Sequence, residues 1–255
     1  MPPAVHCDVR YHDRRALVRM TGSLSLATAP TARIALLKCI ADQPDAVIVD
    51  LAELVVEEPL ALSVFTAVAR QAAMWPGTPI LFSAPPAPTA ALLTSGGYGP
   101  LPIYPSVRAA LATSDGRVSL PSLSDELLPV SGACRQARDL LTEACVRWDL
   151  PHLVAPASIV AGELVANVIA HAHTPMTLRL ALRRRHLHIA VRDGCNTEPK
   201  PAADAPPLTA AAGRGLLLVG AIAQRWGSLP THGGKVVWAI LSTSMAPMGP
   251  LGTPL

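Results

Sequence analysis

Charged and aromatic side chains are scarce in this sequence of 255 residues: 15% of the residues are charged and 4% are aromatic. The formal net charge at pH 7 is only +3. Nucleic-acid-binding proteins rely on a strongly basic surface and often on aromatic side chains that stack on bases. The composition therefore argues against direct binding of nucleic acid.

Cysteines are few and widely separated. The five thiols belong to Cys7, Cys39, Cys134, Cys145 and Cys195, and no two of them form a CxxC pair. An odd number at these spacings argues against a disulfide framework and a zinc site, and it fits a protein of the reducing cytoplasm.

Long uninterrupted hydrophobic runs are missing, although hydrophobic residues make up 50% of the chain and suffice for a buried core. The longest apolar stretches, residues 153–170 and 208–223, are interrupted by Glu163, Asn167 and Arg214. A membrane-spanning helix needs about 18 or more predominantly apolar residues, and the chain does not open with a signal-peptide pattern. We therefore expect no membrane-embedded segment.

The first half of the chain alternates strand patterns with helical ones. The expected strands are residues 7–11, 16–21, 46–49, 80–82 and 102–104, and the expected helices are residues 28–40, 60–73, 89–94 and 106–112. Strands that alternate with helices form mostly parallel sheets. We predict an α/β domain over residues 1–115.

The second half has a different order, in which two helices precede a pair of strands. The expected helices are residues 131–148 and 157–171, the paired strands are residues 176–182 and 187–192, and a helix that begins at Gly215 precedes a last strand at 235–241. This order predicts an α+β sandwich over residues 116–245. Residues 246–255, rich in proline and glycine, are predicted to be a flexible tail.

Three segments of the first half, ALVRMTGSLSLATAP, AVIVDL and LPIYPSVRAAL, occur in order within residues 5–113. They resemble the STAS domain of anti-sigma factor antagonists. In that family an Asp-Ser-Ser-Gly turn at a helix N-terminus carries the serine that a partner kinase phosphorylates. The corresponding turn here is Glu58-Pro59-Leu60-Ala61. Because Pro59 and Leu60 have no hydroxyl group, we expect a degenerate phosphoacceptor position and a domain that is not a kinase substrate.

A stripe of polar residues crosses the apolar helix predicted at residues 157–171. Glu163, Asn167 and His171 are spaced by four, so an α-helix places them on one face. Polar groups beside a core are costly unless they are paired or used. By itself this pattern also fits an amphipathic helix with a solvated stripe.

Two glycine-containing segments follow the helix in the sequence. Asp193-Gly194 ends an apolar strand, and Gly213-Arg214-Gly215-Leu216 opens a helix. Glycines before a helix let backbone N–H groups close around phosphates. The lysine of a GxxxxGK[ST] loop is absent, which excludes a Walker-type site, and the context of a dinucleotide fingerprint is not met.

Taken together, the segments GELVANVIAHA, VRDG and GRGLLLVGAIAQRW resemble the asparagine box and the two glycine boxes of the GHKL ATP-binding fold, which is the histidine kinase-like ATPase fold. The similarity spans residues 118–243. Within the GHKL fold, the sequence most resembles anti-sigma factor serine kinases. It implies that ATP and Mg²⁺ are the cofactors. It also implies that Asn167 binds Mg²⁺ and that Glu163 is the general base for the attacking hydroxyl.

The same resemblance implies the remaining nucleotide-binding roles. Asp193, followed by Gly194, would accept a hydrogen bond from the adenine amino group, and His171 would lie at the pocket edge. The phosphates would be held by the segment Gly213, Arg214, Gly215 and Leu216, and residues 196–212 would form a lid.

Three further positions bear on this interpretation. Cys195 stands where the family often has a glycine, and Val236 stands where a threonine of the last strand usually helps to hold adenine. Both differences would weaken ATP binding. Arg138 matches a family arginine that grips protein partners, although an ordinary exposed helix arginine fits the pattern equally well.

The resemblance implies an ATP-dependent, cytoplasmic, bacterial anti-sigma-factor-type regulator. It would phosphorylate a serine on a separate STAS-type antagonist and sequester a sigma factor, so a protein serine/threonine kinase is expected. The expected partners are a sigma factor, a separate STAS-type antagonist protein or both, with a homodimer as one option for the oligomeric state, and with no direct nucleic acid and no membrane. The alternative is a non-catalytic ATP-binding interaction module with the STAS-like domain docked in cis.

Overall fold

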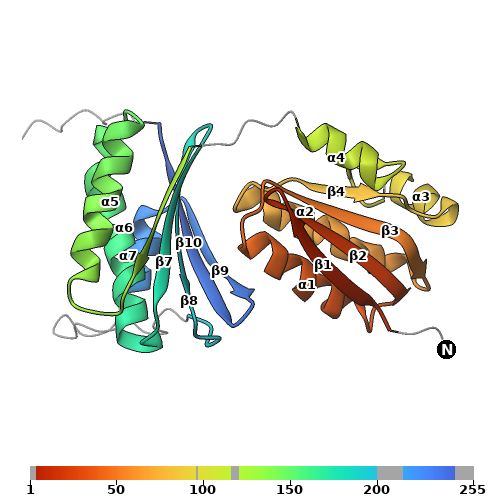
Figure 1. Cartoon of the computed structure of the whole chain (residues 1–255), viewed down its shortest axis with the longest axis horizontal. Helices are drawn as coiled ribbons and strands as arrows, with labels where there is room; N and C mark the ends of the chain where they lie inside the picture. Colours follow the sequence, from red (N-terminus) through yellow and green to blue (C-terminus); the bar gives the residue numbers. More distant parts are fainter. Residues whose placement is uncertain (1–3, 96, 116–120, 200–214, 245–255) are drawn as a thin grey trace, which may run out of the picture. The chain divides into compact units, whose positions relative to one another are not determined.

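The computed structural model describes residues 4–95, 97–115, 121–199 and 215–244 (Figure 1). The chain divides into two compact units, with residues 1–119 making up most of the first and residues 120–255 most of the second. The predicted tail at residues 246–255 lies outside the described residues.

The first unit is built on a five-stranded sheet. Its strands, in spatial order, are β1 (His6–His12), β2 (Arg15–Leu24), β3 (Ala46–Val56), β4 (Ile80–Ser83) and β5 (Ile103–Tyr104). The β1–β2 pair is antiparallel, and the pairs β2–β3, β3–β4 and β4–β5 are parallel. The predicted α/β class with a mostly parallel sheet is confirmed.

Helices cover both faces of this sheet. They are α1 (Ala29–Ala41), the short 3₁₀ helix η1 (Pro59–Leu62), α2 (Ser63–Met74), α3 (Ala87–Thr94) and α4 (Val107–Asp115). Successive residues of a strand face opposite sides. Ile48 accordingly packs with Ala110 of α4. On the other face, the ring of Phe82 in β4 lies 5.0 Å from that of Phe65 in α2. Central strand β3 is therefore buried on both faces over its first four residues, as its unbroken apolar run predicts.

In the described part of the second unit the helices lie on one face of the sheet (Figure 1). The strands, in spatial order, are β6 (Ser122–Leu127), β7 (Met176–Arg183), β8 (His186–Asp193), β10 (Gly234–Ser242) and β9 (Arg225–Thr231). The pairs β6–β7, β7–β8 and β8–β10 are antiparallel. The helices are α5 (Ala133–Arg147), η2 (Pro151–Leu153), α6 (Val154–Asn167), the π-helical turn η3 (Val168–Ala172) and α7 (Gly215–Ile222). The predicted α+β sandwich is confirmed.

Strand β9 has no counterpart among the strands expected from the sequence. Its segment contains Gly227 and Pro230, two residue types that are depleted in strands. A proline is tolerated at the edge of a sheet, where β9 lies. A Cβ atom at Gly227 would lie 2.7 Å from Cζ2 of Trp238, so the glycine makes room for the indole ring.

One described helix, Pro151–Ala172, meets the length and composition test for crossing a membrane, which the sequence analysis did not expect of any segment. Within the second unit this helix packs against α5, α7 and β8. Its buried side chains, among them Val160, Leu164 and Val165, belong to the hydrophobic core. The helix therefore has the packing of a core helix.

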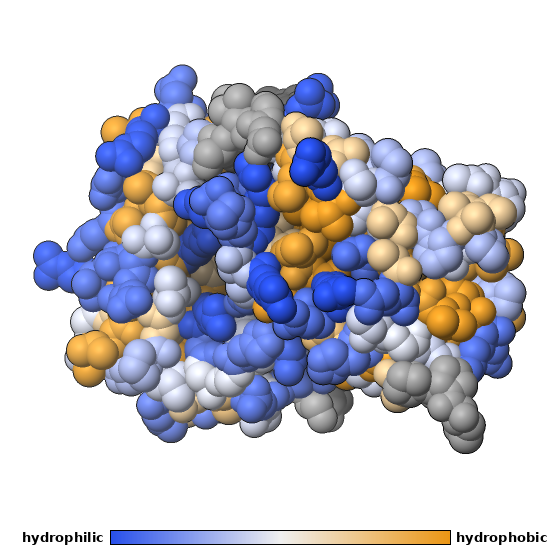
Figure 2. Space-filling view, turned by 45° about the vertical axis from the view of Figure 1, so that its right-hand side comes forward, coloured by the Kyte–Doolittle hydropathy of each residue, from blue (hydrophilic) through white to orange (hydrophobic). Residues whose placement is uncertain are grey.

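Large hydrophobic side chains are also exposed in both units, and Figure 2 shows them in patches between hydrophilic ones. In the first unit the most exposed is Leu60, at 70%, with Val55 and Leu26 also above half. In the second unit Val146 and Leu128 stand out.

Candidate functional site

The polar stripe predicted on the apolar helix begins in α6 and continues into the turn that follows it. Glu163 and Asn167 lie one turn apart in α6, and both are half-buried. His171 lies in the π-helical turn, where the backbone N–H of His173 donates to the carbonyl oxygen of Val168 at 2.9 Å. The α-helix predicted over residues 157–171 therefore ends as a π-helical turn, and the side chain of His171 is exposed.

The carboxylate of Glu163 lies against the first residue of α7. A Cβ atom added to Gly215 would be 2.5 Å from Oε2 of Glu163. The chain thus brings the predicted base to the N-terminal end of the helix that the sequence analysis assigned to the phosphates. A helix N-terminus favours negative charge because its N–H groups are unpaired and the dipole is positive there.

Strand β8 carries the second part of the site at the end of its helix-facing side. Leu187, Ile189 and Val191 belong to the core under the helices, and alternation places Asp193 on the same side. In β10, Lys235 pairs in register with Asp193, and Val237, two residues on, is again in that core. The side of the sheet that faces the helices therefore ends in a charged pair.

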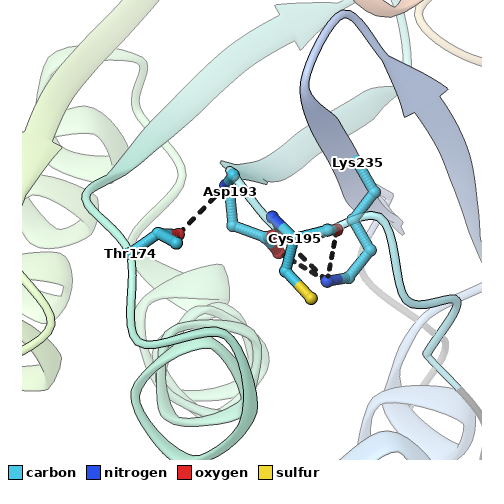
Figure 3. Close-up of polar contacts among 5 residues, drawn as sticks. Thr174, Asp193, Cys195 and Lys235 are labelled. Atoms are coloured by element: carbon cyan, nitrogen blue, oxygen red, sulfur yellow. Dashed lines mark hydrogen bonds and ion pairs between the residues drawn. The ribbon is translucent and has the colours of Figure 1, made fainter.

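Asp193 and Lys235 form an ion pair with side chains that are 0% and 7% exposed. The Lys235 ammonium lies 3.0 Å from Oδ1 and 3.0 Å from Oδ2, and it also donates to the carbonyl oxygen of Cys195 at 3.1 Å (Figure 3). The backbone N–H of Cys195 donates to Oδ1 at 2.8 Å. No hydrogen bond of good geometry reaches the buried Oδ2 from the residues that the structure describes.

The segment after Asp193 is fixed by two threonines. The backbone N–H of Gly194 donates to Oγ1 of Thr174 at 3.0 Å (Figure 3). Hydrogen bonding with Thr197 lowers the pKa of the Cys195 thiol, and the charge of Lys235 acts in the same direction. Cys195 is thus the thiol of the second unit with the greatest tendency to ionise, in contrast to Cys134 and Cys145, whose pKa values are raised by burial.

The predicted phosphate segment is only partly described. Gly213 and Arg214, and residues 200–212 of the predicted lid, lie outside the described residues. Gly215 and Leu216 begin α7, and the side chain of Leu216 is buried in the core, which leaves only its backbone for a ligand.

Arg138, the predicted partner-binding residue, is exposed on α5. Its charge and that of Glu163 act in opposite directions on the pKa of Cys134, which burial raises. Cys134 Sγ in turn lies 3.9 Å from the carbonyl oxygen of Gly162. The charges of Arg138 on α5 and Glu163 on α6 therefore both affect the Cys134 thiol.

The turn predicted to correspond to the phosphoacceptor position forms the 3₁₀ helix η1, whose first two residues are exposed. Pro59 opens η1, and Leu60 is 70% exposed. Oε2 of Glu58 accepts a hydrogen bond from the backbone N–H of Leu26 at 2.6 Å. The Tyr98 hydroxyl donates to the carbonyl oxygen of Pro59 at 2.5 Å. These contacts fix the turn without any hydroxyl at the two serine positions.

Lys235 and Thr174 were not predicted from the sequence, and Val236 was expected at the adenine-facing position of the last strand. Val236 pairs with Arg192 and lies on the other side of the sheet from Asp193. The residue of β10 that contacts Asp193 is Lys235. The only available signal was its place next to Val236, because the strand register that aligns Lys235 with Asp193 cannot be deduced from one sequence.

The residues present fit a nucleotide and a hard cation. Asp193 ends β8 on the helix-facing side of the sheet, but its carboxylate is 0% exposed and each of its oxygens lies 3.0 Å from the Lys235 ammonium, so a base amino group would have to displace part of this ion pair. Asn167 offers an amide oxygen, a ligand type suited to Mg²⁺. Among the described residues no group of three or more His, Cys, Asp or Glu side chains could hold a metal by itself, as expected where phosphates complete the coordination.

Comparison with known proteins supports the assignment of the second unit. Residues 131–241 match the family model described as a histidine kinase-like ATPase domain. No curated protein matches the sequence.

Several solved structures are similar to the chain. The anti-sigma factor antagonist SpoIIAA in its unphosphorylated form is 15% identical with a TM-score of 0.38, and the match covers 45% of this chain and 100% of that one. An anti-sigma factor antagonist from Mycobacterium paratuberculosis is 23% identical with a TM-score of 0.37, covering 44% of this chain and 95% of that one. The RsbU and RsbW domains of Rv1364c from Mycobacterium tuberculosis are 14% identical with a TM-score of 0.37, covering 85% of this chain and 47% of that one.

All three TM-scores are below 0.5, so the fold of each unit is assigned from its own strand order. For the second unit the strand order and the match to a histidine kinase-like ATPase domain agree.

Proposed function

We propose that the second unit binds ATP with Mg²⁺ and transfers the γ-phosphoryl group to a serine of a separate STAS-type antagonist protein in the cytoplasm. The proposal includes sequestration of a sigma factor by the same chain, with Arg138 contacting the protein partner. It rests on the resemblance of the second half to anti-sigma factor serine kinases and on the match of residues 131–241 to the histidine kinase-like ATPase domain.

The observation that carries the proposal is the convergence of three segments that are far apart in the sequence. Glu163 and Asn167 lie one turn apart on α6, the carboxylate of Glu163 lies against Gly215 at the start of α7, and Asp193 ends β8 on the side of the sheet that faces these helices. These are the positions that the sequence analysis assigned to the base, the metal, the phosphates and the adenine.

Phosphoryl transfer needs mainly positioning and charge stabilisation from the protein. In the proposed reaction the serine oxygen of the antagonist attacks the γ-phosphorus, and the bond from that phosphorus to the bridging oxygen breaks. ADP leaves with the electron pair of that bond. Glu163 takes the hydroxyl proton on a carboxylate oxygen. Bound Mg²⁺ would supply neutralising charge at the phosphates, with Asn167 as its protein ligand.

The first unit is proposed to act as an interaction domain, not as a substrate. The turn that holds the phosphorylated serine in the resembled family has Pro59 and Leu60 at the two serine positions. Because neither side chain has a hydroxyl oxygen, a kinase has no acceptor atom there.

Replacement of the proposed base tests this function. Glu163→Gln should retain ATP but lose phosphate transfer by about 100-fold or more, since a general base contributes to the chemical step and not to binding. Transfer of the γ-phosphate to co-purifying proteins should be measured for the whole chain with ATP and Mg²⁺. The matched control is Glu126→Gln, because Glu126 is an exposed glutamate of the same unit.

Normal transfer in Glu163→Gln would show that Glu163 is not the base. A wild-type chain that binds ATP but transfers no phosphate to any candidate antagonist would favour the alternative of a non-catalytic ATP-binding interaction module. One feature of the site favours this alternative: the Asp193 carboxylate is fully buried and paired with Lys235. The adenine ring of ATP would have to contact that carboxylate for tight binding.

A further inference from the structure

A threonine side chain connects two segments of the proposed nucleotide site. The backbone N–H of Gly194, the residue after Asp193, donates to Oγ1 of Thr174 at 3.0 Å (Figure 3). Thr174 lies in the segment that leads from the end of α6, where Asn167 is located, to the start of β7. The hydrogen bond therefore ties the end of strand β8 to the segment that follows the proposed metal ligand.

The path of the chain brings Thr174 to this place. Only the π-helical turn η3 and His173 lie between Asn167 and Thr174. The backbone N–H of His173 donates to the carbonyl oxygen of Val168, and His173 has a left-handed conformation with φ 55° and ψ 31°. Residues other than glycine rarely adopt this conformation, and they keep it where the surrounding structure holds them. The place of Thr174 is thus tied to that of the helix end.

The threonine acts just beyond the end of a strand pair. Met176 and Asp193 are the last residues of β7 and β8 that pair in register on this side. Thr174 and Gly194 lie past this pair, so the hydroxyl extends the connection between the two chains. A Cβ atom added to Gly194 would lie 3.3 Å from Cγ2 of Thr174. The threonine side chain therefore also covers the face of Gly194 on which another residue would carry its side chain.

The turn Asp193–Cys195 has two further restraints, and both come from the sheet. The backbone N–H of Cys195 donates to Oδ1 of Asp193 at 2.8 Å, and the Cys195 carbonyl oxygen accepts from Lys235 at 3.1 Å. These two bonds fix the turn relative to β8 and β10. Thr174 supplies a hydrogen bond that fixes the same turn relative to the segment leading from Asn167.

The hydroxyl of Thr174 can be removed without opening the core. Gly194 is exposed and Thr174 is half-buried, so water can replace the hydroxyl as the acceptor for the Gly194 N–H. Loss of the hydroxyl should accordingly leave the fold intact and change the position of the turn.

We propose that Thr174 is a positioning residue, which sets the separation between the Asp193–Cys195 turn and Asn167 so that one nucleotide can contact both. A ligand that spans two contact points gains affinity when their separation is fixed in advance. Loss of the hydroxyl should weaken the binding of ATP, which spans both points, more than that of a ligand confined to the Asn167 end. This inference rests on the proposed function, because it needs both segments to contact ATP.

The test is isothermal titration calorimetry of the whole chain with Mg²⁺ and two probes, ATP and inorganic tripolyphosphate, which has the phosphate chain but no base. The affinity for tripolyphosphate is obtained from its competition with ATP. Thr174→Val, which replaces the hydroxyl by a methyl group, should weaken ATP binding by about three- to tenfold, the typical net contribution of one hydrogen bond. Its affinity for tripolyphosphate should be unchanged. Thr174→Ser, which keeps the hydroxyl, should bind ATP as the wild type does.

The matched control is Thr142→Val, because the Thr142 hydroxyl donates to a carbonyl oxygen within α5, and this variant should bind ATP normally. A second variant disturbs the contact from the other side. Gly194→Ala places a Cβ atom 3.3 Å from the Thr174 methyl group, so it should also weaken ATP binding. Combination with Thr174→Ser, which lacks that methyl group, should restore part of the affinity.

Normal ATP affinity in Thr174→Val would overturn the inference and leave the proposed function intact. An equal loss of affinity for ATP and tripolyphosphate would do the same, since it would show a general disturbance of the site. A wild-type chain that does not bind ATP would overturn both the inference and the proposed function.

Discussion

The two units differ in where they place polar groups relative to their cores. In the first unit the turn that should carry the phosphoacceptor is exposed, and its carboxylate, Glu58, is bonded to the backbone N–H of Leu26. In the second unit an ion pair, Asp193 with Lys235, is buried at the end of a hydrophobic sheet face.

This difference indicates which unit holds the stronger candidate for a chemical site. A surface hydrogen bond that fixes a turn has little desolvation cost. Burial of a charge, in contrast, lowers the free energy of unfolding, and the fold does not need a charge at that position. Polar groups that interrupt a buried face are therefore the stronger sign of a ligand. By that criterion the candidate site lies in the second unit, in line with the proposal that the first unit acts as an interaction domain.

The largest expected effect is confined to one glycine of the second unit. Gly234→Ala would place a Cβ atom 1.9 Å from the Asp193 carbonyl oxygen, and a backbone atom cannot move aside as a flexible side chain can. We expect a loss of more than about 4 kcal/mol in the stability of the second unit. Hydrogen exchange should show lost protection in β8 and β10 and unchanged protection in β3 of the first unit.

Gly162 provides the matched control, since a Cβ atom at this position in α6 meets nothing within 4 Å. Gly162→Ala should stabilise the protein by up to about 1 kcal/mol through helix propensity. If Gly234→Ala reduced protection equally in both units, the two units would not unfold independently, which would contradict this prediction.

The next effect separates a buried ion pair from an exposed one. Lys235→Met should destabilise the second unit by about 3–5 kcal/mol, because it leaves the Asp193 carboxylate buried and uncompensated. Arg14→Met removes the positive charge from an exposed pair, in which Arg14 Nε lies 3.2 Å from Asp45 and the side chains are 61% and 41% exposed. This change should cost less than about 1 kcal/mol of stability. Urea unfolding of both variants measures the two losses in the free energy of unfolding. Similar losses would show that the buried pair of the second unit is no more important for stability than the exposed pair of the first.

The smallest effect concerns thiol reactivity. Burial raises the pKa of Cys7 to about 11 and that of Cys39 to about 12 in the first unit, whereas hydrogen bonding with Thr197 lowers the pKa of Cys195. Only the thiolate reacts with alkylating agents. At pH 7.5 iodoacetamide should therefore label Cys195 before Cys7 and Cys39, as followed by peptide mass spectrometry.

Nucleotide should slow the labelling of Cys195 and leave the first unit unaffected, since Cys195 follows Asp193 in the proposed site. Cys195→Ser is the control that removes the fast phase. Labelling of Cys7 at the same rate as Cys195 would show that the two thiols do not differ in the predicted way.

Much of both folds could be predicted from the sequence because the patterns are local. The buried run Ala46–Val49, with β-branched valines and isoleucine, and the helical spacing of apolar residues around Glu163 identify their elements without further information. The four-residue spacing of Glu163 and Asn167 likewise follows from helix geometry alone.

What could not be predicted depends on contacts between distant segments. Strand β9 was missed because Gly227 and Pro230 disfavour a strand in general and are accepted only at an edge beside Trp238. The role of Lys235 depends on the register of β8 and β10. The place of His171 depends on a π-helical turn that no spacing in the sequence indicates.

The central claim, that the second unit binds ATP through a magnesium ion held by Asn167, is tested most directly by calorimetric titration of the whole chain with ATP, with and without Mg²⁺. The account predicts that Mg²⁺ strengthens ATP binding by at least about tenfold in the wild type and in Gln136→Ala, an exposed amide on α5, and that this gain is lost in Asn167→Ala, because one metal ligand is removed. No binding of ATP by the wild type, or an equal gain from Mg²⁺ in Asn167→Ala, would contradict it.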